Sequence, residues 1–502
     1  MTADNGWDLP GHYTGRLHFL RKFLPIATLG IAIPVLYFFD LNGVGVISPD
    51  EPRYAAIGET MARTGHLITP CLWGSPWFEK PPLLYWMTAL ATWSGWRAEL
   101  AGRVPVAVLS LAFLAVTYIL LNREFGGRAA AVATGMLATS AGWLAYSSLC
   151  LTDVPLAACF CMAVFLALPL LRQQPRLERL NLRFASIGVF LGLGALAKGL
   201  VPLALAVPFF WFLRAYWRKW WVAALTCFAI SLPWYIAVYL ENGDAFVQEF
   251  FVKHHFERLY SASLQHVQPW YYYFPVVLLG LFPWTPLIGL LLGRDIQWER
   301  RKQFLAAIVA FGFVMFSVSR NKLPGYPLPF LPCLLVLIGS YFENKSLVEL
   351  PKAWLVACAV LIAMIPLAAS ILPASLVVGR FTFSAIRIDR TAVFYIAAPL
   401  AVVLLARRSW IPILLVLAIV AGGIYLKAVC YPVIDDHVSA RGLWRRIQPV
   451  ANEVCDGGTN RDWIYGLNFY KPSPIPYCGT GPFRFMMRSV GRNQPTLTPV
   501  HP

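Results

Sequence analysis

The stretch Ser48-Pro49-Asp50-Glu51-Pro52-Arg53-Tyr54, followed by Phe78-Glu79-Lys80-Pro81-Pro82-Leu83, decides how this chain is interpreted. The two segments bring acidic and basic residues into one polar loop, which follows the first apolar segment of membrane length. Charged side chains at a membrane boundary lose favourable hydration, so they usually mark a binding or catalytic site. This loop is therefore the first place where we expect chemistry.

The composition around the loop is that of an integral membrane protein. Of the 502 residues, 58% are hydrophobic and 13% are charged, whereas soluble domains carry about 25% charged residues. The formal net charge is +17, but the basic residues lie mostly in short loops between apolar segments, which argues against a nucleic-acid partner. No small-residue cleavage site follows the first apolar segment, so we expect it to remain as a helix.

The fold is predicted to be that of an all-α membrane protein, because many segments approach the roughly 20 apolar residues that a spanning helix needs. The apolar stretch 83–96 is too short to span comfortably, and we expect it to form a juxtamembrane helix within the first loop, residues 42–102. About thirteen transmembrane helices are predicted, near residues 23–41, 103–122, 129–148, 154–171, 183–197, 200–217, 219–240, 274–292, 303–319, 326–342, 353–372, 391–407 and 409–428.

The distribution of charge orients this topology. Twenty of the 42 Lys and Arg residues lie at the N-terminus and in even-numbered loops, as is typical of cytoplasmic segments. The odd-numbered loops then face the opposite compartment. We predict two domains, a transmembrane domain over 1–430 and a small non-cytoplasmic C-terminal domain over 431–502.

The cysteines fall into two groups. Cys455 and Cys478 lie in the polar tail, where an oxidising compartment would permit a disulfide, but the sequence leaves both the paired and the free state open. Seven others lie in apolar segments or at their edges, where a small buried hydrophobe is the simplest interpretation; they are Cys150, Cys159, Cys161, Cys227, Cys333, Cys358 and Cys430.

Unusual polar residues collect in the odd-numbered loops, which are predicted to line one cavity. Alone, Lys198 would be a lysine extending from a helix end to the interface, Asp153 would cap a helix, and His254-His255 would decorate the interface. Together, the cations favour recognition of a phosphate, and Glu79 with His255 offers an incomplete ligand set for zinc or manganese. The cations in question are Lys80, Lys198, Arg258 and Lys322.

Motifs in these loops resemble those of the polytopic GT-C glycosyltransferases that use a polyprenyl-phosphate sugar donor. The chain is most similar to the undecaprenyl-phosphate aminoarabinose transferases that modify lipid A, and more distantly similar to protein O-mannosyltransferases. It departs from the family pattern at Trp77 and at Lys253-His254. The matching segments are 50–54, 78–86, 196–199, 255–258, 269–272, 283–285 and 322–326.

The resemblance implies an active site that faces the periplasm and an inverting transfer from undecaprenyl phosphate. It implies that Asp50 is the catalytic aspartate with Asp153 in support, and that Glu79 and His255 hold a divalent metal. No nucleotide cofactor is implied. The residues that it assigns to the donor phosphate and substrate are Arg53, Tyr54, Lys80, Tyr85, Lys198, Arg258, Lys322 and Tyr326.

We therefore expect a monomeric glycosyltransferase of the bacterial inner membrane, with lipid A as acceptor and 4-amino-4-deoxy-L-arabinose as the candidate sugar. One alternative is a transferase of the same fold with a protein, another glycan or another lipid as acceptor, for example in mannosyl transfer. The other is a transporter of anionic lipids. The transporter is disfavoured because almost no ionisable residue lies in the middle of a predicted span, where transporters place their coupling groups.

Overall fold

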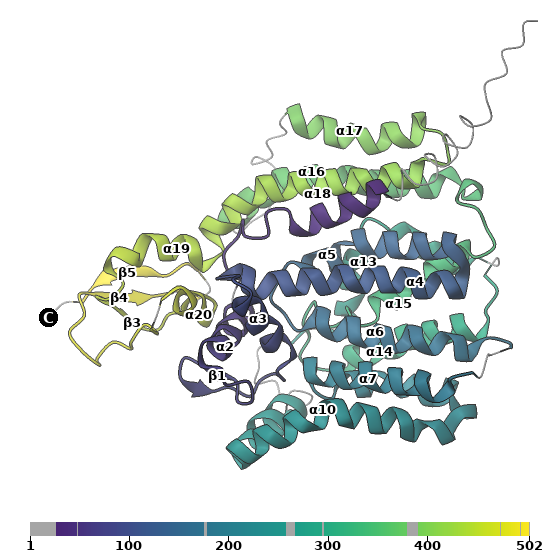
Figure 1. The fold of residues 1–502 in the computed structure, drawn as a ribbon. Coiled ribbons are helices and arrows are strands. Elements are labelled where there is room, and N and C mark those ends of the chain that lie inside the picture. Colours follow the sequence, from purple (N-terminus) through teal and green to yellow (C-terminus); the bar gives the residue numbers. More distant parts are fainter. Residues whose placement is uncertain are drawn as a thin grey trace, which may run out of the picture.

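A computed structural model shows a bundle of helices that run side by side, with the first loop and the C-terminal segment gathered at one end (Figure 1, left). It describes residues 27–47, 49–174, 178–257, 267–293, 296–378, 390–471, 473–491 and 493–500, without the side chains of 254–257, 347 and 373–378. The candidate site is positioned by the C-terminal tail and by the loops that the predicted topology numbers as odd.

Seven helices in the described part of the chain are long and apolar enough to cross a membrane, so the protein is a multi-pass membrane protein. Two more segments, Trp270–Leu281 (η4 and α13) and Thr285–Leu292 (η5), are bent by 109° and make an eighth span if they count as one. The seven are α4 (Glu99–Thr139), α6 with η1 (Asp153–Leu171), α7 (Leu180–Lys198), η2 with α10 (Arg214–Asn242), α14 (Arg300–Val318), α16 (Lys352–Val378, of which Lys352–Leu372 is the span) and α18 (Ile411–His437).

Shorter apolar helices complete the bundle. They are Ala27–Phe38, Val201–Phe212 (α8, Val201–Leu205, and α9, Val207–Phe212), Leu331–Phe342 (α15, Leu331–Gly339, and η6, Ser340–Phe342) and α17 (Arg390–Leu405). Between α10 and η4 lie the short α11 (Asp244–Phe246) and a π-helical segment η3 (Val247–Glu257). The four apolar helices each fall on or beside a segment that the sequence marks as apolar.

The 41-residue helix α4 is broken at Gly126, which has φ 80° and ψ 161°. A positive φ of this size suits glycine, which has no Cβ to clash with the backbone. The break separates the predicted spans 103–122 and 129–148, and α5 (Ala141–Ser147) continues the second of them. One residue without a side chain thus turns a single long helix into two segments.

The core of the bundle lies around α6, whose apolar side chains point in every direction and are almost all buried. A helix that is hydrophobic all round belongs in an interior. The seven cysteines predicted to be buried hydrophobes are buried, as predicted. On the flank, α7 packs closely on α10, because a Cβ at Gly188 would lie 2.1 Å from the carbonyl oxygen of Ala223, and small residues permit such an approach.

The first loop folds into α2 (Asp50–Thr64), the hairpin β1 (Cys71–Leu72) and β2 (Ser75–Pro76), and α3 (Leu83–Trp93). Two acidic residues lie in the first turn of α2, where they complement the helix dipole. The helix ends at Gly65, whose N–H donates to the Met61 carbonyl. The segment predicted to form a short helix in this loop is helical, as α3, with 11 residues.

The C-terminal segment is a small α/β unit with its own core, and it corrects the prediction of an all-α chain. It contains α19 (Ala440–Ile447), β3 (Val454–Asp456), α20 (Arg461–Tyr470), β4 (Phe485–Arg488) and β5 (Thr496–Pro499). The sheet order is β3-β4-β5, parallel then antiparallel. A disulfide joins Cys455 to Cys478. Helix α18 runs past residue 430, where the sequence places the domain boundary, to His437.

Candidate active site

Arg53 is the centre of a charged cluster in the first loop. Its Nη1 donates to Glu79 at 2.6 Å, its Nη2 to Asp50, and its Nε to the Pro49 carbonyl at 3.0 Å. Lys80 donates to the other oxygen of Glu79 at 2.9 Å. Burial alone would lower the pKa of Arg53, but Glu79 and Asp50 outweigh it and raise the pKa above its usual range. Arg53 is therefore a permanent cation held between two carboxylates.

Asp50 is the member of this cluster that faces open space. Its side chain is 37% exposed, whereas those of Arg53 and Glu79 are each 10% exposed. Asp50 lies at the start of α2, so the helix fixes its backbone while the Arg53 guanidinium fixes one carboxylate oxygen. An exposed carboxylate beside a buried cation is placed to meet a substrate.

Aromatic rings lie against the cluster. The Arg53 guanidinium carbon lies 5.3 Å from the ring centre of Trp77 and 5.8 Å from that of Tyr54. Tyr54 and Tyr85 are buried, with ring centres 6.0 Å apart. Within the described residues, Trp77 Nε1 and the Tyr85 hydroxyl are buried without a hydrogen-bond partner. Most buried polar atoms in folded proteins have a hydrogen-bond partner, so these two atoms remain able to bind a ligand.

A second charged pair brings together predicted residues from three loops. Lys198, at the end of α7, donates to Asp153 at 2.7 Å, and each side chain is 14% exposed. The Lys198 ammonium also lies 5.1 Å from the ring centre of Tyr326. Asp153 lies in the first turn of α6, so it both opens that helix and binds the lysine. The N-cap of α6 is Thr152, without a side-chain cap hydrogen bond, so Asp153 is an acidic first-turn residue and the partner of Lys198 and does not cap the helix.

Tyr146 connects the two charged groups, and sequence reasoning missed it. Both Asp153 and Asp50 lie close enough to interact electrostatically with its hydroxyl. Gly325 packs against Asp153 and Tyr146 so tightly that a Cβ there would lie 2.7 Å from the carboxylate and 2.9 Å from the hydroxyl. The first, third, fifth and ninth loops therefore meet, as their common side in the predicted topology requires.

Lys322 is buried in the ninth loop with carbonyl partners. Its ammonium donates to the Gln268 carbonyl at 3.1 Å and to the Ser319 carbonyl at 2.5 Å. No carboxylate within the described part of the chain forms an ion pair with it. Burial lowers the pKa of Lys322. Within the described residues, only carbonyl oxygens accept hydrogen bonds from the Lys322 ammonium, so an anionic ligand would stabilise its charge.

Of the predicted metal ligands Glu79 and His255, the structure describes the side chain of Glu79. Both oxygens of Glu79 bind cations, Arg53 and Lys80, so the described residues around Glu79 do not fit a metal site. No group of three or more metal-ligating side chains occurs within the described ranges. The side chain of His255 and the whole of Arg258 lie outside the described residues.

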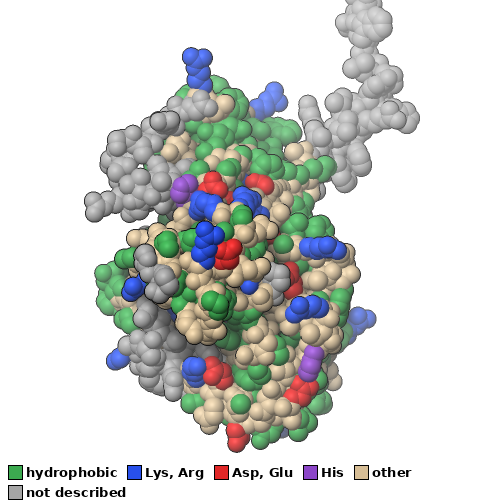
Figure 2. All heavy atoms as spheres, turned by 90° about the vertical axis from the view of Figure 1, so that its left-hand side faces the viewer, with side chains coloured by type: hydrophobic (Ala, Val, Ile, Leu, Met, Phe, Trp, Pro, Cys, Tyr) green, Lys and Arg blue, Asp and Glu red, His purple; other side chains and the backbone are tan. Residues whose placement is uncertain are grey.

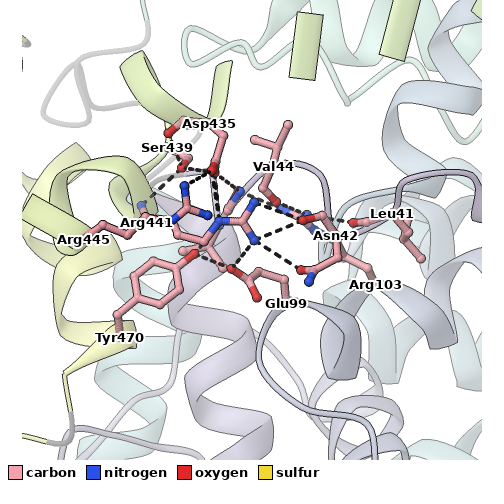
Figure 3. Close-up of polar contacts among 12 residues, drawn as sticks. Leu41, Asn42, Val44, Glu99, Arg103, Asp435, Ser439, Arg441, Arg445 and Tyr470 are labelled. Carbon is pink, nitrogen blue, oxygen red and sulfur yellow. Dashed lines mark hydrogen bonds and ion pairs between the residues drawn. The ribbon is translucent and has the colours of Figure 1, made fainter. Parts of the chain in front are cut away.

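Glu51, next to Asp50, anchors the first loop to the bundle. Its carboxylate accepts from Arg103 at 2.7 and 2.8 Å, from the Ile47 N–H at 2.7 Å and from the Cys150 N–H at 3.1 Å. Arg103 also donates to three carbonyls of the preceding loop, those of Leu41, Val44 and Gly45 (Figure 3). Sequence reasoning gave Arg103 only the role of a span boundary.

The C-terminal unit joins the same network (Figure 3). Arg441 donates to Asp435 at 2.9 Å and to the Asn42 carbonyl at 3.0 Å, and it lies 3.3 Å from Glu99. The Tyr470 hydroxyl donates to Glu99 at 2.6 Å. Figure 2 views this end of the molecule directly, where acidic and basic side chains are interspersed.

Glu59, on α2, gives the loop a pH-dependent stability. Burial and the nearby Glu99 raise the pKa of Glu59 from 4.5 to about 7. The folded state therefore binds this proton more tightly than the unfolded state, and the stabilisation present below pH 4.5 is lost as the pH rises through 7. At pH 8, Glu59→Gln should be more stable than the wild type by on the order of 2 kcal/mol in free energy of unfolding, and it should therefore melt at a higher temperature. At pH 5, the two proteins should melt at about the same temperature.

Thermal unfolding of the detergent-purified protein at both pH values measures this difference. Glu453→Gln, in a carboxyl that is 47% exposed in the tail, serves as the control and should leave the pH dependence unchanged. An identical pH dependence in Glu59→Gln and the wild type would contradict the assignment.

Comparisons with known proteins find a family model and relatives that are similar to a large part of the chain. The family described as dolichyl-phosphate-mannose-protein mannosyltransferase matches residues 23–260. An undecaprenyl phosphate-alpha-4-amino-4-deoxy-L-arabinose arabinosyl transferase of Pseudomonas fluorescens is 30% identical over 358 residues, which are 68% of this chain and 59% of the relative. The corresponding transferase of Pseudomonas aeruginosa is 30% identical over 331 residues, 63% of this chain and 59% of its own length. The chain thus spans about three fifths of the length of these relatives.

Among solved structures, ArnT from Cupriavidus metallidurans bound to undecaprenyl phosphate is similar over nearly the whole chain. The TM-score is 0.75 at 25% identity, and the match covers 91% of this chain and 86% of that one. The resemblance that the loop motifs predicted is therefore confirmed in sequence and in fold.

Proposed function

We propose, from the premise that this chain is a relative of the GT-C glycosyltransferases and is similar to the aminoarabinose transferases, that it transfers a sugar from undecaprenyl phosphate to an acceptor outside the cytoplasm. The observation that carries the proposal is the meeting of Asp50, Arg53, Asp153 and Lys198 through loops of one side of the bundle. The names of these relatives supply the donor class, and the first acceptor to test is lipid A.

The proposed topology has thirteen membrane helices, with the site and the C-terminal unit on the periplasmic side of the inner membrane. Two observations support that number. The break at Gly126 divides α4 into two crossings, and the bent pair counts as one. The seven long helices, with α4 counted twice, the bent pair and the four shorter apolar helices then correspond one to one with the predicted spans. The transmembrane domain would end with α18, at His437, and the tail would form a separate periplasmic domain.

The basic side chains would hold the donor. The donor phosphate carries negative charge that grows as its bond to the sugar breaks, and preorganised cations stabilise such charge effectively. Lys198 and Lys322 are the best placed, because Lys198 is partly exposed beside Tyr326 and Lys322 has only carbonyl partners among the described residues. Lys80 and Arg53 lie in the adjacent cluster, and the donor's apolar tail would lie between helices.

The acceptor would attack the anomeric carbon from the face opposite the phosphate, which inverts that centre. A hydroxyl acceptor loses a proton in this step, and the exposed Asp50 would accept it as general base. A lipid A phosphate is already anionic, and Asp50 would then orient it or stabilise positive charge on the sugar. Both oxygens of Glu79 engage cations, so no step here uses a metal.

Transfer by the purified protein tests the proposal. The detergent-solubilised chain receives undecaprenyl phosphate that carries labelled aminoarabinose, together with lipid A, and the label in the lipid A fraction is measured. We expect label in lipid A. Label that moves instead to another glycan, lipid or protein would keep the transferase and change the acceptor. Binding of neither donor nor undecaprenyl phosphate would overturn the proposal and favour the transporter.

A further inference from the structure

One ring from the C-terminal unit reaches the Arg53 cluster. Tyr465, on α20, places its ring centre 5.4 Å from the Arg53 guanidinium carbon. The C-terminal unit lies outside residues 23–260, where the family described above matches. The ring is therefore a contribution to the site that the motif resemblance does not assign.

The position of Tyr465 is fixed from both sides. On its own helix, Trp463 and Leu467 are buried in the core of the C-terminal unit. On the other side, Trp73 lies with its ring centre 5.4 Å from that of Tyr465. Trp73 and Gly74 form the two-residue turn of the β1–β2 hairpin, both with positive φ, which is the tight turn geometry typical of such hairpins. The ring is held between a helix and a hairpin.

The guanidinium of Arg53 is confined by this ring and two others. Its N–H groups are directed at Asp50, Glu79 and the Pro49 carbonyl, and three aromatic rings, those of Tyr54, Trp77 and Tyr465, lie within 5.8 Å of its carbon. Aromatic faces attract cations and leave their N–H groups to other acceptors. Removal of one ring would allow the Arg53 guanidinium to tilt, and the Asp50 carboxylate bound to it would tilt as well.

We propose that Tyr465 is a positioning residue that holds Arg53, and through it Asp50, in the geometry for transfer, so that the C-terminal domain completes the active site. The inference rests on the proposed function, since it assigns to Arg53 and Asp50 the roles given there. The aromatic face of Tyr465 positions Arg53, and the Tyr465 hydroxyl has no part in this role. The domain thus contributes to the reaction rate as well as to the fold.

Three tail variants and their transfer kinetics test this inference. Tyr465→Leu keeps apolar bulk without a ring and should lower kcat about tenfold, with the donor KM changed less than about twofold. Tyr465→Phe keeps the ring and should restore kcat to within about twofold of the wild type. Tyr477→Leu, at a tail tyrosine that is 73% exposed, should behave as the wild type. Melting temperatures of all three are measured beside the rates.

The outcomes separate the two proposals. A wild type that transfers sugar and a Tyr465→Leu variant that is equally fast would overturn the inference alone. Failure of Tyr465→Phe to restore kcat would overturn the role of the ring face. Equal losses of activity and melting temperature in Tyr465→Leu and Tyr477→Leu would reduce Tyr465 to a structural residue. A wild type that neither binds undecaprenyl phosphate nor transfers sugar would overturn the proposed function and this inference with it.

Discussion

Asp50→Asn should lower the transfer rate at least about 100-fold and leave the protein folded. The amide keeps the shape of the side chain but can neither accept a proton nor carry the negative charge, and general-base catalysis contributes on the order of 100- to 10,000-fold. The fold should survive because Asp50 is 37% exposed and Arg53 retains Glu79 and the Pro49 carbonyl. Initial rates with the labelled donor, together with the melting temperature, measure both effects.

The control for this loss is Asp436→Asn, which neutralises an exposed carboxylate at the end of α18 on the same side of the molecule. It should keep the wild-type rate, since Asp436 has no place in the cluster. If Asp50→Asn retains more than half of the wild-type rate, the carboxylate of Asp50 has no catalytic role.

Arg103→Met should destabilise the protein more than any surface change. The side chain is 3% exposed, and its loss leaves the buried Glu51 carboxylate without its cation and three carbonyls without their donor. Breaking a buried ion pair from one side costs about 3–5 kcal/mol, so we expect the melting temperature in detergent to fall by on the order of 10 °C. Transfer should be lost as well, because Glu51 fixes the first turn of α2.

Two further variants define the origin of that loss. The exposed pair of Lys253 and Glu249 is 55% and 41% exposed, so Lys253→Met should change the stability by less than about 1 kcal/mol. The double variant Glu51→Gln with Arg103→Met should be more stable than Arg103→Met alone, because it removes the uncompensated charge. An Arg103→Met protein that melts within about 2 °C of the wild type would show that this network does not stabilise the loop.

The bundle was predictable because apolar segments in a membrane have few alternatives to the helix. Predicted spans such as 154–171 and 183–197 fall on α6 and α7. The strands of the tail escaped notice because they hold only three or four residues, too few for an alternating pattern to emerge. Gly126 looks like any other glycine in a small-residue stretch, and its positive φ is visible only in the structure.

The contacts of the candidate site were predictable where charge and motif coincide, and not where a residue lies outside the motifs. Asp50, Arg53, Glu79 and Lys80 lie in the motif segments and do meet. Asp153 and Lys198 also meet, although 45 residues separate them. In contrast, Arg103 stands at the start of an apolar run and Tyr465 in a tail without motifs, so neither carries a local signal. Their importance arises from pairings that only the folded chain defines.

The ties between the two ends of the chain have a consequence for its synthesis. The Gly45 N–H donates to Asp435, which follows 390 residues later, and the Val46 N–H donates to Tyr470, 424 residues later. The ribosome releases the loop that carries Asp50 long before it makes either partner. A nascent chain therefore cannot complete this loop until α18 and the C-terminal unit have been made and have folded against it, so activity should begin only when assembly is finished.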